Sequence, residues 1–444
     1  MENLSEETMH NTNNLIKEGD YVIIRKENFM KVHRVSKNSI FTITKDDVDT
    51  SSIIGKPFWT TFEIVPSSKG ESINNLQPVT KAEMLEKLRF DSLKSGVDNR
   101  LINDNGTSQQ LSKQKILDLR KAGKSGKEIV QTLIENSTSF STKTEYSQEK
   151  YIRKKGKKYF QYLTICRPTI ALLQELYFRQ DYYKINSIRM DTLAQIISYS
   201  DIKSDGVHLL YDSGSLGLVA ASILNRIGAN TSGSLINLYL GNDPQNTAVK
   251  AMNFPSDLLN RLTNLNLKDL IQSKERVAKI PPTESKEDSP EILKTEKQST
   301  AESGTECAEN KESSEDNSRK RKTPTDTDTD LESNVPQKKS KTCATNLLST
   351  TKVDSLVIVA REHPLNIVEL LINFVKKSRP FVIFHTNREP LQEIYVLLKQ
   401  KYRVVNLKLF TNFLRSYQIL TDRTHPDILT SSCNGYLLTG YCTQ

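Results

Sequence analysis

The chain has 444 residues, of which 36% are hydrophobic, and its mean hydropathy is −0.52. This length predicts two or three folded units, and the low apolar share predicts a substantial disordered part. The net charge of +9 favours polyanionic partners. Five scattered cysteines without a Cys-x-x-Cys pair argue against a disulfide framework or a metal site and fit a reducing compartment. Without a membrane-length apolar run or a signal peptide, we expect an intracellular protein with no membrane partner.

Residues 15–95 form the first predicted unit, a small N-terminal β-barrel followed by a short helix. Polar residues and glycines separate short β-rich runs at close intervals, a pattern typical of small antiparallel barrels. The predicted strands are Tyr21–Arg25, Met30–Val35, Ser39–Thr44 and Phe58–Val65, and the predicted helix is Lys81–Leu93.

Residues 96–200 form a predicted helical and basic connector, in which apolar residues recur at helical spacing. Its predicted helices are Leu111–Lys121, Lys127–Glu135, Tyr146–Tyr162, Ile170–Tyr177 and Asp191–Ser198.

One connector segment, residues 143–158, holds seven Lys or Arg against two Glu, a local net charge of +5. On a helix, many of these cations share one face, where they can meet phosphates while interleaved tyrosines stack on unpaired bases. A solvated helix face with inward-packed tyrosines is about equally compatible with an isolated basic helix, but the charge density favours RNA or DNA binding. The predicted nucleic-acid contacts are Lys150, Arg153, Lys154, Lys155, Lys157 and Lys158.

A second candidate contact is a polar loop with Arg415 and Arg423, which we expect to cross the carboxyl ends of the later strands. For this segment taken alone, an ordinary surface loop is the simpler interpretation.

Residues 201–444 alternate between strand and helix, which predicts an α/β domain with a doubly wound, mostly parallel sheet. A final short strand at Asn434–Tyr441 is expected to pair antiparallel at the end of this sheet. The predicted strands are Val207–Tyr211, Ser234–Leu240, Ser355–Ala360, Phe381–His385 and Arg403–Leu409, and the predicted helices are Leu216–Ile227, Leu365–Phe374 and Pro390–Gln400.

The predicted α/β domain is interrupted at residues 273–350, which contain no aromatic residue and are rich in Ser, Thr, Glu, Lys and Pro. Such a composition cannot bury enough apolar area to offset its ordering entropy, so we expect a disordered insertion. Two basic clusters within it, Ser318–Lys322 and Lys338–Lys341, suit recognition by nuclear import receptors, although ordinary linker charge is an alternative. We therefore expect a nuclear protein.

The run that begins at the buried strand Val207–Tyr211 continues through Asp212 and Gly214 into a helix. It is similar to the loop by which Rossmann-like methyltransferases hold S-adenosylmethionine, which reads Asp-x-Gly-x-Gly-x-Gly when intact. Here the second and third glycine positions are Leu216 and Leu218, and Gly217 is out of register. Because those glycines allow positive φ and close approach of a ligand, the sequence predicts a methyltransferase fold with a degenerate cofactor loop.

Longer motifs along the chain together resemble a known family, the non-catalytic, RNA-binding subunits of the eukaryotic tRNA (adenine(58)-N(1))-methyltransferases. The resemblance covers the chain from the N-terminal barrel to the C-terminus, except for the insertion. The motifs are Asp98–Ser112, Glu128–Ser137, Lys143–Lys155, Arg189–Gln195, Arg415–Pro426 and Gly435–Gly440.

This resemblance implies an N-terminal β-barrel and a C-terminal Rossmann-like methyltransferase domain. It also implies a catalytic partner subunit that binds S-adenosylmethionine, assembled two plus two, and a tRNA substrate methylated on N1 of the adenosine at position 58 in the T-loop. The basic helix at Lys150–Lys158 would supply tRNA contacts, and a nuclear location would agree with the basic clusters.

Two further positions support the loss of catalysis. In the catalytic relatives, the strand that corresponds to Ser355–Ala360 ends in an aspartate, whereas Ala360 can neither accept a hydrogen bond through its side chain nor act as a base. Glu362 and His363 are possible substitutes, but both lie beyond the strand end. The strand Ser234–Leu240 also lacks a terminal acid for ribose hydroxyls.

We therefore predict a subunit without a catalytic or cofactor-binding residue of its own. The alternatives are an active methyltransferase with a divergent loop that uses Asp212 and Gly214, and a protein that binds DNA or chromatin.

Overall fold

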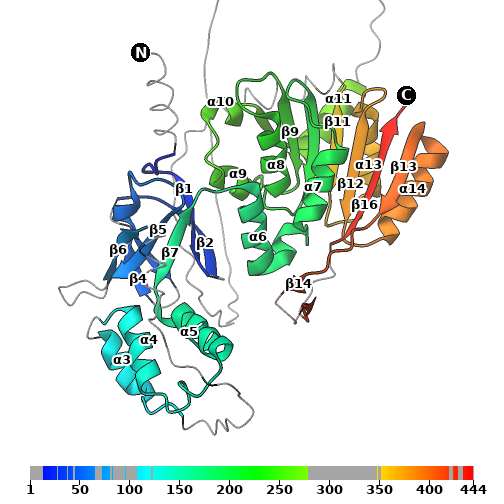
Figure 1. The fold of residues 1–444 in the computed structure, drawn as a ribbon. Helices are drawn as coiled ribbons and strands as arrows, with labels where there is room; N and C mark the ends of the chain where they lie inside the picture. The colour runs from blue at the N-terminus through cyan, green and yellow to red at the C-terminus, as the bar shows by residue number, and fades with distance from the viewer. Residues whose placement is uncertain are drawn as a thin grey trace, which may run out of the picture.

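The computed structural model describes residues 14–80 (except 28, 38, 44–45 and 66–72), 108–278 (except 122–123), 352–419, 424–428 and 434–443, together with residues 83, 96 and 348. Figure 1 shows an N-terminal sheet, a group of three helices and a C-terminal α/β unit. The predicted helix Lys81–Leu93 falls almost wholly outside the described residues.

The N-terminal unit is a seven-stranded sheet of order β2-β1-β7-β5-β6-β4-β3. Alternating apolar residues of these strands form one buried cluster inside the curved sheet, around Phe62 and Ile165. Among the described residues, no backbone hydrogen-bond ladder joins the edge strands β2 and β3. The two strands are nevertheless in contact, because the rings of His33 and Phe41 pack edge to face with their centroids 5.0 Å apart. The strands are β1 (Tyr21–Lys26), β2 (Phe29–Arg34), β3 (Ile40–Ile43), β4 (Asp46–Asp49), β5 (Thr60–Val65), β6 (Ile73–Val79) and β7 (Tyr162–Cys166).

The central strand β7 lies in the region that the sequence assigned to the helical connector. It pairs antiparallel with both β1 and β5, so the N-terminal unit contains two segments far apart in the chain. The predicted boundary between barrel and connector is therefore wrong at this point. The predicted helix to Tyr162 instead ends at Tyr159, because the alternation of half-buried and buried side chains in β7 favours a strand.

Between β6 and β7 the chain forms helices α3 (Lys113–Lys121), α4 (Gly126–Glu135) and α5 (Glu145–Tyr159). Helix α4 begins with a capping box, in which Ser125 accepts from the Glu128 backbone and Glu128 reaches back to the Ser125 N–H. Gly126 lies where the start of α4 meets the end of α5, and a Cβ there would be 2.7 Å from the carbonyl oxygen of Tyr159. The close approach therefore requires glycine.

The α/β unit has a seven-stranded sheet of order β10-β9-β8-β11-β12-β16-β13. Its first five strands are parallel, and β16 runs antiparallel between β12 and β13. The doubly wound prediction is confirmed, but the last strand is inserted into the sheet and does not close its end. The strands are β8 (Val207–Asp212), β9 (Ser234–Tyr239), β10 (Leu262–Asn266), β11 (Ser355–Val359), β12 (Pro380–His385), β13 (Val404–Phe410) and β16 (Tyr436–Cys442).

Helices cover both faces of this sheet, and each face has its own buried apolar cluster. Helices α6, α7 and α8 contribute to one cluster, and α11, α13 and α14 contribute to the other. Figure 1 shows where these helices lie around the sheet. The helices are α6 (Ile170–Asp181), α7 (Met190–Tyr199), α8 (Leu218–Ile227), α9 (Thr247–Ala251), α10 (Ser256–Leu259), α11 (Leu267–Ala278), α13 (Leu365–Leu371) and α14 (Glu389–Lys401), with short 3-10 turns at Tyr182–Ile185 and Ile372–Phe374.

The N-terminal sheet is joined directly to the α/β unit. Ile23 and Met30 are buried in the same apolar cluster as α6, and the Asn253 side chain bonds the Tyr21 backbone at 2.8 and 2.7 Å. Because α6 and α7 also pack in this cluster, they belong to the α/β unit and not to a separate connector.

The predicted insertion at residues 273–350 is also too wide. Helix α11 continues to Ala278, and Leu348 is buried in the second apolar cluster of the α/β unit. Most of the intervening segment lies outside the described residues.

Candidate functional site

The strand order reverses between β8 and β11, where the chain turns to one side through β9 and β10 and to the other through β12. In open α/β sheets, ligands bind in the crevice at the carboxyl ends of the strands that flank such a point. Asp212 ends β8, and Ala360 and Arg361 follow β11, so the residues singled out in the sequence lie at this crevice. The structure therefore brings the degenerate loop and the lost acid position together.

Asp212 holds the turn that follows β8. Its carboxylate accepts hydrogen bonds from the backbone N–H groups of Gly214 and Ser215 at 3.0 and 2.8 Å, and from the Ser215 hydroxyl. Burial raises the pKa of this carboxyl, and the three donors favour its charged form. The acid is thus used within the loop, as in an Asx turn.

The two residues after this turn have left-handed backbone conformations, with φ of 55° at Leu216 and 75° at Gly217. For a leucine this conformation costs about 1–2 kcal/mol. The loop after β9 lies against them: a Cβ on Gly217 would be 2.4 Å from the Gln245 carbonyl oxygen, and the Ala248 N–H donates to the Leu216 carbonyl at 3.0 Å. The space beside Gly217 is filled by protein.

Gly214 is covered in a similar way by Arg361. A Cβ on Gly214 would be 2.1 Å from Arg361 Nε. The Arg361 side chain is held there by Nη2, which donates to the carbonyl oxygens of Tyr183, Lys184 and Gly214 at 2.8, 3.1 and 3.2 Å. A cofactor could not approach either remaining glycine of the loop without displacing these contacts. The residues at this crevice therefore do not fit S-adenosylmethionine.

The two possible substitutes for the lost acid are engaged elsewhere. The Glu362 carboxylate accepts a hydrogen bond from the buried Tyr211 hydroxyl, which raises the pKa of Tyr211 in addition to the larger effect of burial. The His363 imidazole pairs with Glu393 at 3.1 Å on the surface. Strand β9 ends at Tyr239, which is buried, so the strand is not closed by an acid.

The basic helix predicted from the sequence is α5, and its cations differ in surroundings. Lys150, Lys154 and Lys158 are exposed, and none of them forms an ion pair with another described residue. Arg153 is also exposed but pairs with Glu149 at 2.8 Å, one turn earlier. Lys157 lies in the helix, and its side chain is outside what the structure describes.

The aromatic side chains of α5 and its flank are mostly structural. The Tyr151 ring packs edge to face on the buried Phe140, with the ring centroids 5.4 Å apart. Its hydroxyl accepts a hydrogen bond from the Gln109 amide. Lys155 is half-buried over the same ring at 5.3 Å, and burial lowers the pKa of this lysine. Tyr162 stacks on the buried Phe160 at 5.8 Å. The interpretation of inward-packed aromatics is thus correct for these residues, while the exposed lysines remain available.

The second predicted contact lies near a two-stranded hairpin of β14 (Tyr417–Gln418) and β15 (His425–Pro426). Arg415 precedes β14 and is exposed, whereas Arg423 lies outside the described residues. Phe413 is 87% exposed beside it, so this segment presents apolar as well as basic side chains.

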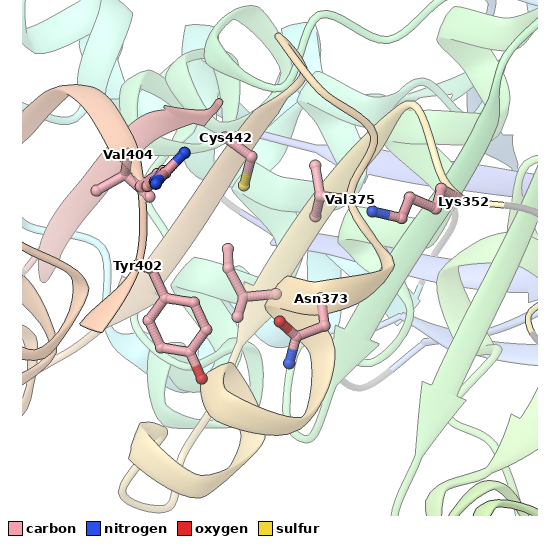
Figure 2. Close-up of a pocket in the computed structure, with 8 residues that line it drawn as sticks. Lys352, Asn373, Val375, Tyr402, Val404 and Cys442 are labelled. Atoms are coloured by element: carbon pink, nitrogen blue, oxygen red, sulfur yellow. The ribbon is translucent and has the colours of Figure 1, made fainter. Parts of the chain in front are cut away.

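Figure 2 shows a cavity at the opposite end of the α/β sheet, near the amino ends of β11 and β13 and the carboxyl end of β16. Lys352, Tyr402 and Cys442 are among its lining residues. Its volume of about 40 Å³ has room for water but not for a nucleotide. Burial raises the pKa of the Cys442 thiol to about 11, which makes it unreactive at neutral pH. This cavity is not a candidate site.

Within the described parts of the chain, no group of three or more His, Cys, Asp or Glu residues could hold a metal ion. The described helices include none with the length and apolar character required to cross a membrane.

The sheet order, with one antiparallel strand before the last, and the acid-turn-helix loop at its switch point define a Rossmann-like methyltransferase fold. Solved structures with this fold include an S-adenosylmethionine-dependent O-methyltransferase from Thermotoga maritima, which is 10% identical, has a TM-score of 0.48 and covers 98% of this chain and 96% of its own. The tRNA (m1A58) methyltransferase TrmI from Aquifex aeolicus is 10% identical and has a TM-score of 0.42. The match covers 97% of this chain and 100% of the TrmI chain.

The chain belongs to the Gcd10p family, whose model matches residues 15–328. It is similar to the tRNA (adenine(58)-N(1))-methyltransferase non-catalytic subunit TRM6 of Mus musculus, with 33% identity over 96% of this chain and 88% of the mouse protein. The protein of the same name from Dictyostelium discoideum is 31% identical over 97% of this chain and 80% of its own. The family that the sequence motifs predicted is thereby confirmed.

Proposed function

We propose that this chain is the non-catalytic subunit of a tRNA N1-adenosine methyltransferase that modifies the adenosine at tRNA position 58. The observation that carries this proposal is the crevice between β8 and β11, where Arg361 covers Gly214 and Gln245 covers Gly217. The non-catalytic subunits among its relatives support the same assignment over nearly the whole chain. The alternative of an active enzyme with a divergent loop is not favoured, because Asp212 is engaged within its own turn.

The catalytic partner would bind S-adenosylmethionine, and this chain would bind none. We propose an assembly of two copies of each subunit. Support for a partner comes from the names of the relatives, which describe a subunit and not a complete enzyme.

The contribution of this chain to tRNA binding is assigned to the exposed face of α5. Lys150, Lys154 and Lys158 occur at spacings of four residues, so their ammonium groups project on one side of the helix. Each phosphate that such a side chain neutralises releases counterions, which makes the binding strong at low salt and sensitive to added salt. Arg415 is a secondary candidate on the α/β unit.

A nuclear location is also proposed, on the strength of the two basic clusters at Ser318–Lys322 and Lys338–Lys341. Both lie outside the described residues. Replacing the lysines and arginines of both clusters with glutamine should shift a fluorescent fusion from nucleus to cytoplasm. An unchanged nuclear distribution in cells that lack the native protein and its partner would reject this proposal.

Binding of labelled S-adenosylmethionine tests the assignment of roles. Equilibrium dialysis should detect one bound cofactor per pair of subunits in the complex and none on this chain alone. Tight, stoichiometric binding to this chain alone would contradict the proposal and favour the active-enzyme alternative.

A further inference from the structure

A larger cavity opens at the carboxyl ends of β11 and β12, beside the crevice of the degenerate loop. Its volume is about 600 Å³, within the range of small-molecule sites. We call it the tyrosine pocket, and its principal lining residues are Tyr182, Tyr183, Asn186, Arg361, Asn387 and Tyr436.

Aromatic rings form one wall of the tyrosine pocket. The rings of Tyr182 and Tyr183 lie 4.2 Å apart, and Tyr183 is 69% exposed, which is unusual for a large aromatic side chain unless a partner covers it. An exposed tyrosine held by a neighbouring ring is a platform on which a flat base can stack, because every nucleobase has a π-face.

A polar group with remaining hydrogen-bonding capacity also lines the tyrosine pocket. Asn186 is only 5% exposed, and its Nδ2 donates to the Ala360 carbonyl at 3.1 Å. In the part of the chain that the structure describes, no donor reaches its Oδ1. This oxygen is open to solvent in the pocket, where an N–H group on the edge of a base would supply a donor.

The positive charge of the tyrosine pocket comes from Arg361. Its Nη2 is fixed by three backbone carbonyls, and the guanidinium forms no ion pair with a described residue. A guanidinium pre-positioned in this way can donate its other N–H groups to a phosphate. The same side chain that covers the cofactor loop therefore brings charge to the neighbouring pocket.

These observations together identify the ligand class as a base with an attached phosphate. We propose that the tyrosine pocket binds one unpaired nucleotide of the tRNA and positions it without modifying it. This inference rests on the proposed tRNA-binding function. In Figure 1 the carboxyl ends of the parallel strands point to the lower side of the view, where α5 and the β14–β15 hairpin also lie, so one RNA could contact all three.

Photo-crosslinking in the complete complex tests this inference. Replacing Tyr183 with the photoreactive residue p-benzoylphenylalanine should give a crosslink to one unpaired nucleotide of bound tRNA. The matched control carries the same residue at Tyr441, which is 36% exposed at the opposite end of the sheet, and should give no such crosslink. Crosslinking from position 183 to the partner polypeptide in place of RNA would overturn the inference.

Substitution of the same residue gives an independent measurement. Tyr183→Ala should weaken tRNA binding by the complex by about fivefold to a hundredfold, while Tyr183→Phe, which retains the ring, should bind nearly as well as the unaltered chain. Equal affinities for both variants in a complex that still binds and methylates tRNA would overturn the pocket assignment and leave the proposed function intact. A complete complex that does not bind tRNA would instead refute the proposed function.

Discussion

Asp212 accepts three hydrogen bonds within its own turn, which predicts a role in folding. Replacing it with alanine removes the acceptor for two buried N–H groups and a hydroxyl. We expect Asp212→Ala to lower the free energy of unfolding by about 1–3 kcal/mol. When the variant complex is assayed at matched folded concentration, tRNA methylation should match that of the unaltered complex.

The comparison between stability and activity separates the two roles of Asp212. Chemical denaturation gives the stability, and circular dichroism sets the folded concentration for the assay. A selective loss of methylation in fully folded complex would indicate that Asp212 takes part in cofactor binding after all.

His208 predicts a pH dependence of stability. It is buried between Ser355 Oγ and the Lys203 carbonyl, at 2.7 and 2.9 Å, and burial lowers its pKa below the usual value. Above pH about 6.5 the imidazole is neutral in both states, so it adds no pH dependence. As the pH falls below that value, the unfolded chain takes up a proton that the folded chain resists, and stability decreases until the folded pKa is passed.

Urea denaturation at pH 7.5 and pH 5.5 checks this effect. The midpoint should decrease with pH in the unaltered chain, and the decrease should be smaller in His208→Gln. Burial also lowers the pKa of His33, so this residue should add to the decrease in stability at low pH. A variant in which both His208 and His33 are replaced with glutamine should therefore show the smallest decrease in the midpoint. An identical decrease in all three chains would contradict the assignment.

At this scale, part of the site could be predicted from local sequence. The misplaced glycines and Ala360 follow from spacing within one loop or strand. The cover over Gly214 could not be predicted, because Arg361 is held by the carbonyls of Tyr183 and Lys184, 178 and 177 residues away. The tyrosine pocket was not predicted from the sequence. Asn186 and Ser187, which line it, have left-handed backbone conformations, and an Asn-Ser pair typical of turns is the local signal that the sequence offered there.

At the scale of secondary-structure elements, α5 carries the main test. Replacing Lys150, Lys154 and Lys158 together with glutamine should weaken tRNA binding about tenfold to a hundredfold near 0.1 M salt. The slope of log affinity against log salt should fall by about 2–3, since each lost phosphate contact removes 0.7–0.9.

A matched control with the same change in net charge replaces Lys268, Lys377 and Lys399, which are exposed at other places on the α/β unit. This control should leave the affinity and the slope almost unchanged. Equal effects of the two triple variants would mean that only the overall charge matters and that α5 is not the RNA contact.

The elements themselves were predicted where local periodicity is strong, as in α4 and α14. Strand pairing was harder to predict, because β7 inserts between β1 and β5 and β16 inserts between β12 and β13, so that the order in each sheet differs from the order along the chain. A pattern of alternating residues indicates a strand but does not identify its neighbours.

At the scale of the whole molecule, the doubly wound sheet followed from the alternation of strands and helices after residue 201. The docking of the N-terminal sheet onto α6 could not be predicted in this way, because it depends on contacts between distant residues, such as Asn253 and Tyr21, which are 232 residues apart. The predicted connector was thereby divided between the two units. The overall arrangement is a Rossmann-like methyltransferase fold in which the Arg361 side chain and the Gln245 backbone lie against the two glycines of the loop after β8.

The most direct test of this account is methyl incorporation from labelled S-adenosylmethionine into tRNA. The assay compares this chain alone, the catalytic partner alone and the two together at equal concentrations. The account predicts activity in the mixture well above that of the partner alone, and none from this chain by itself. Methylation by this chain alone would contradict the account, because it would require a functional cofactor site despite Arg361 and Gln245.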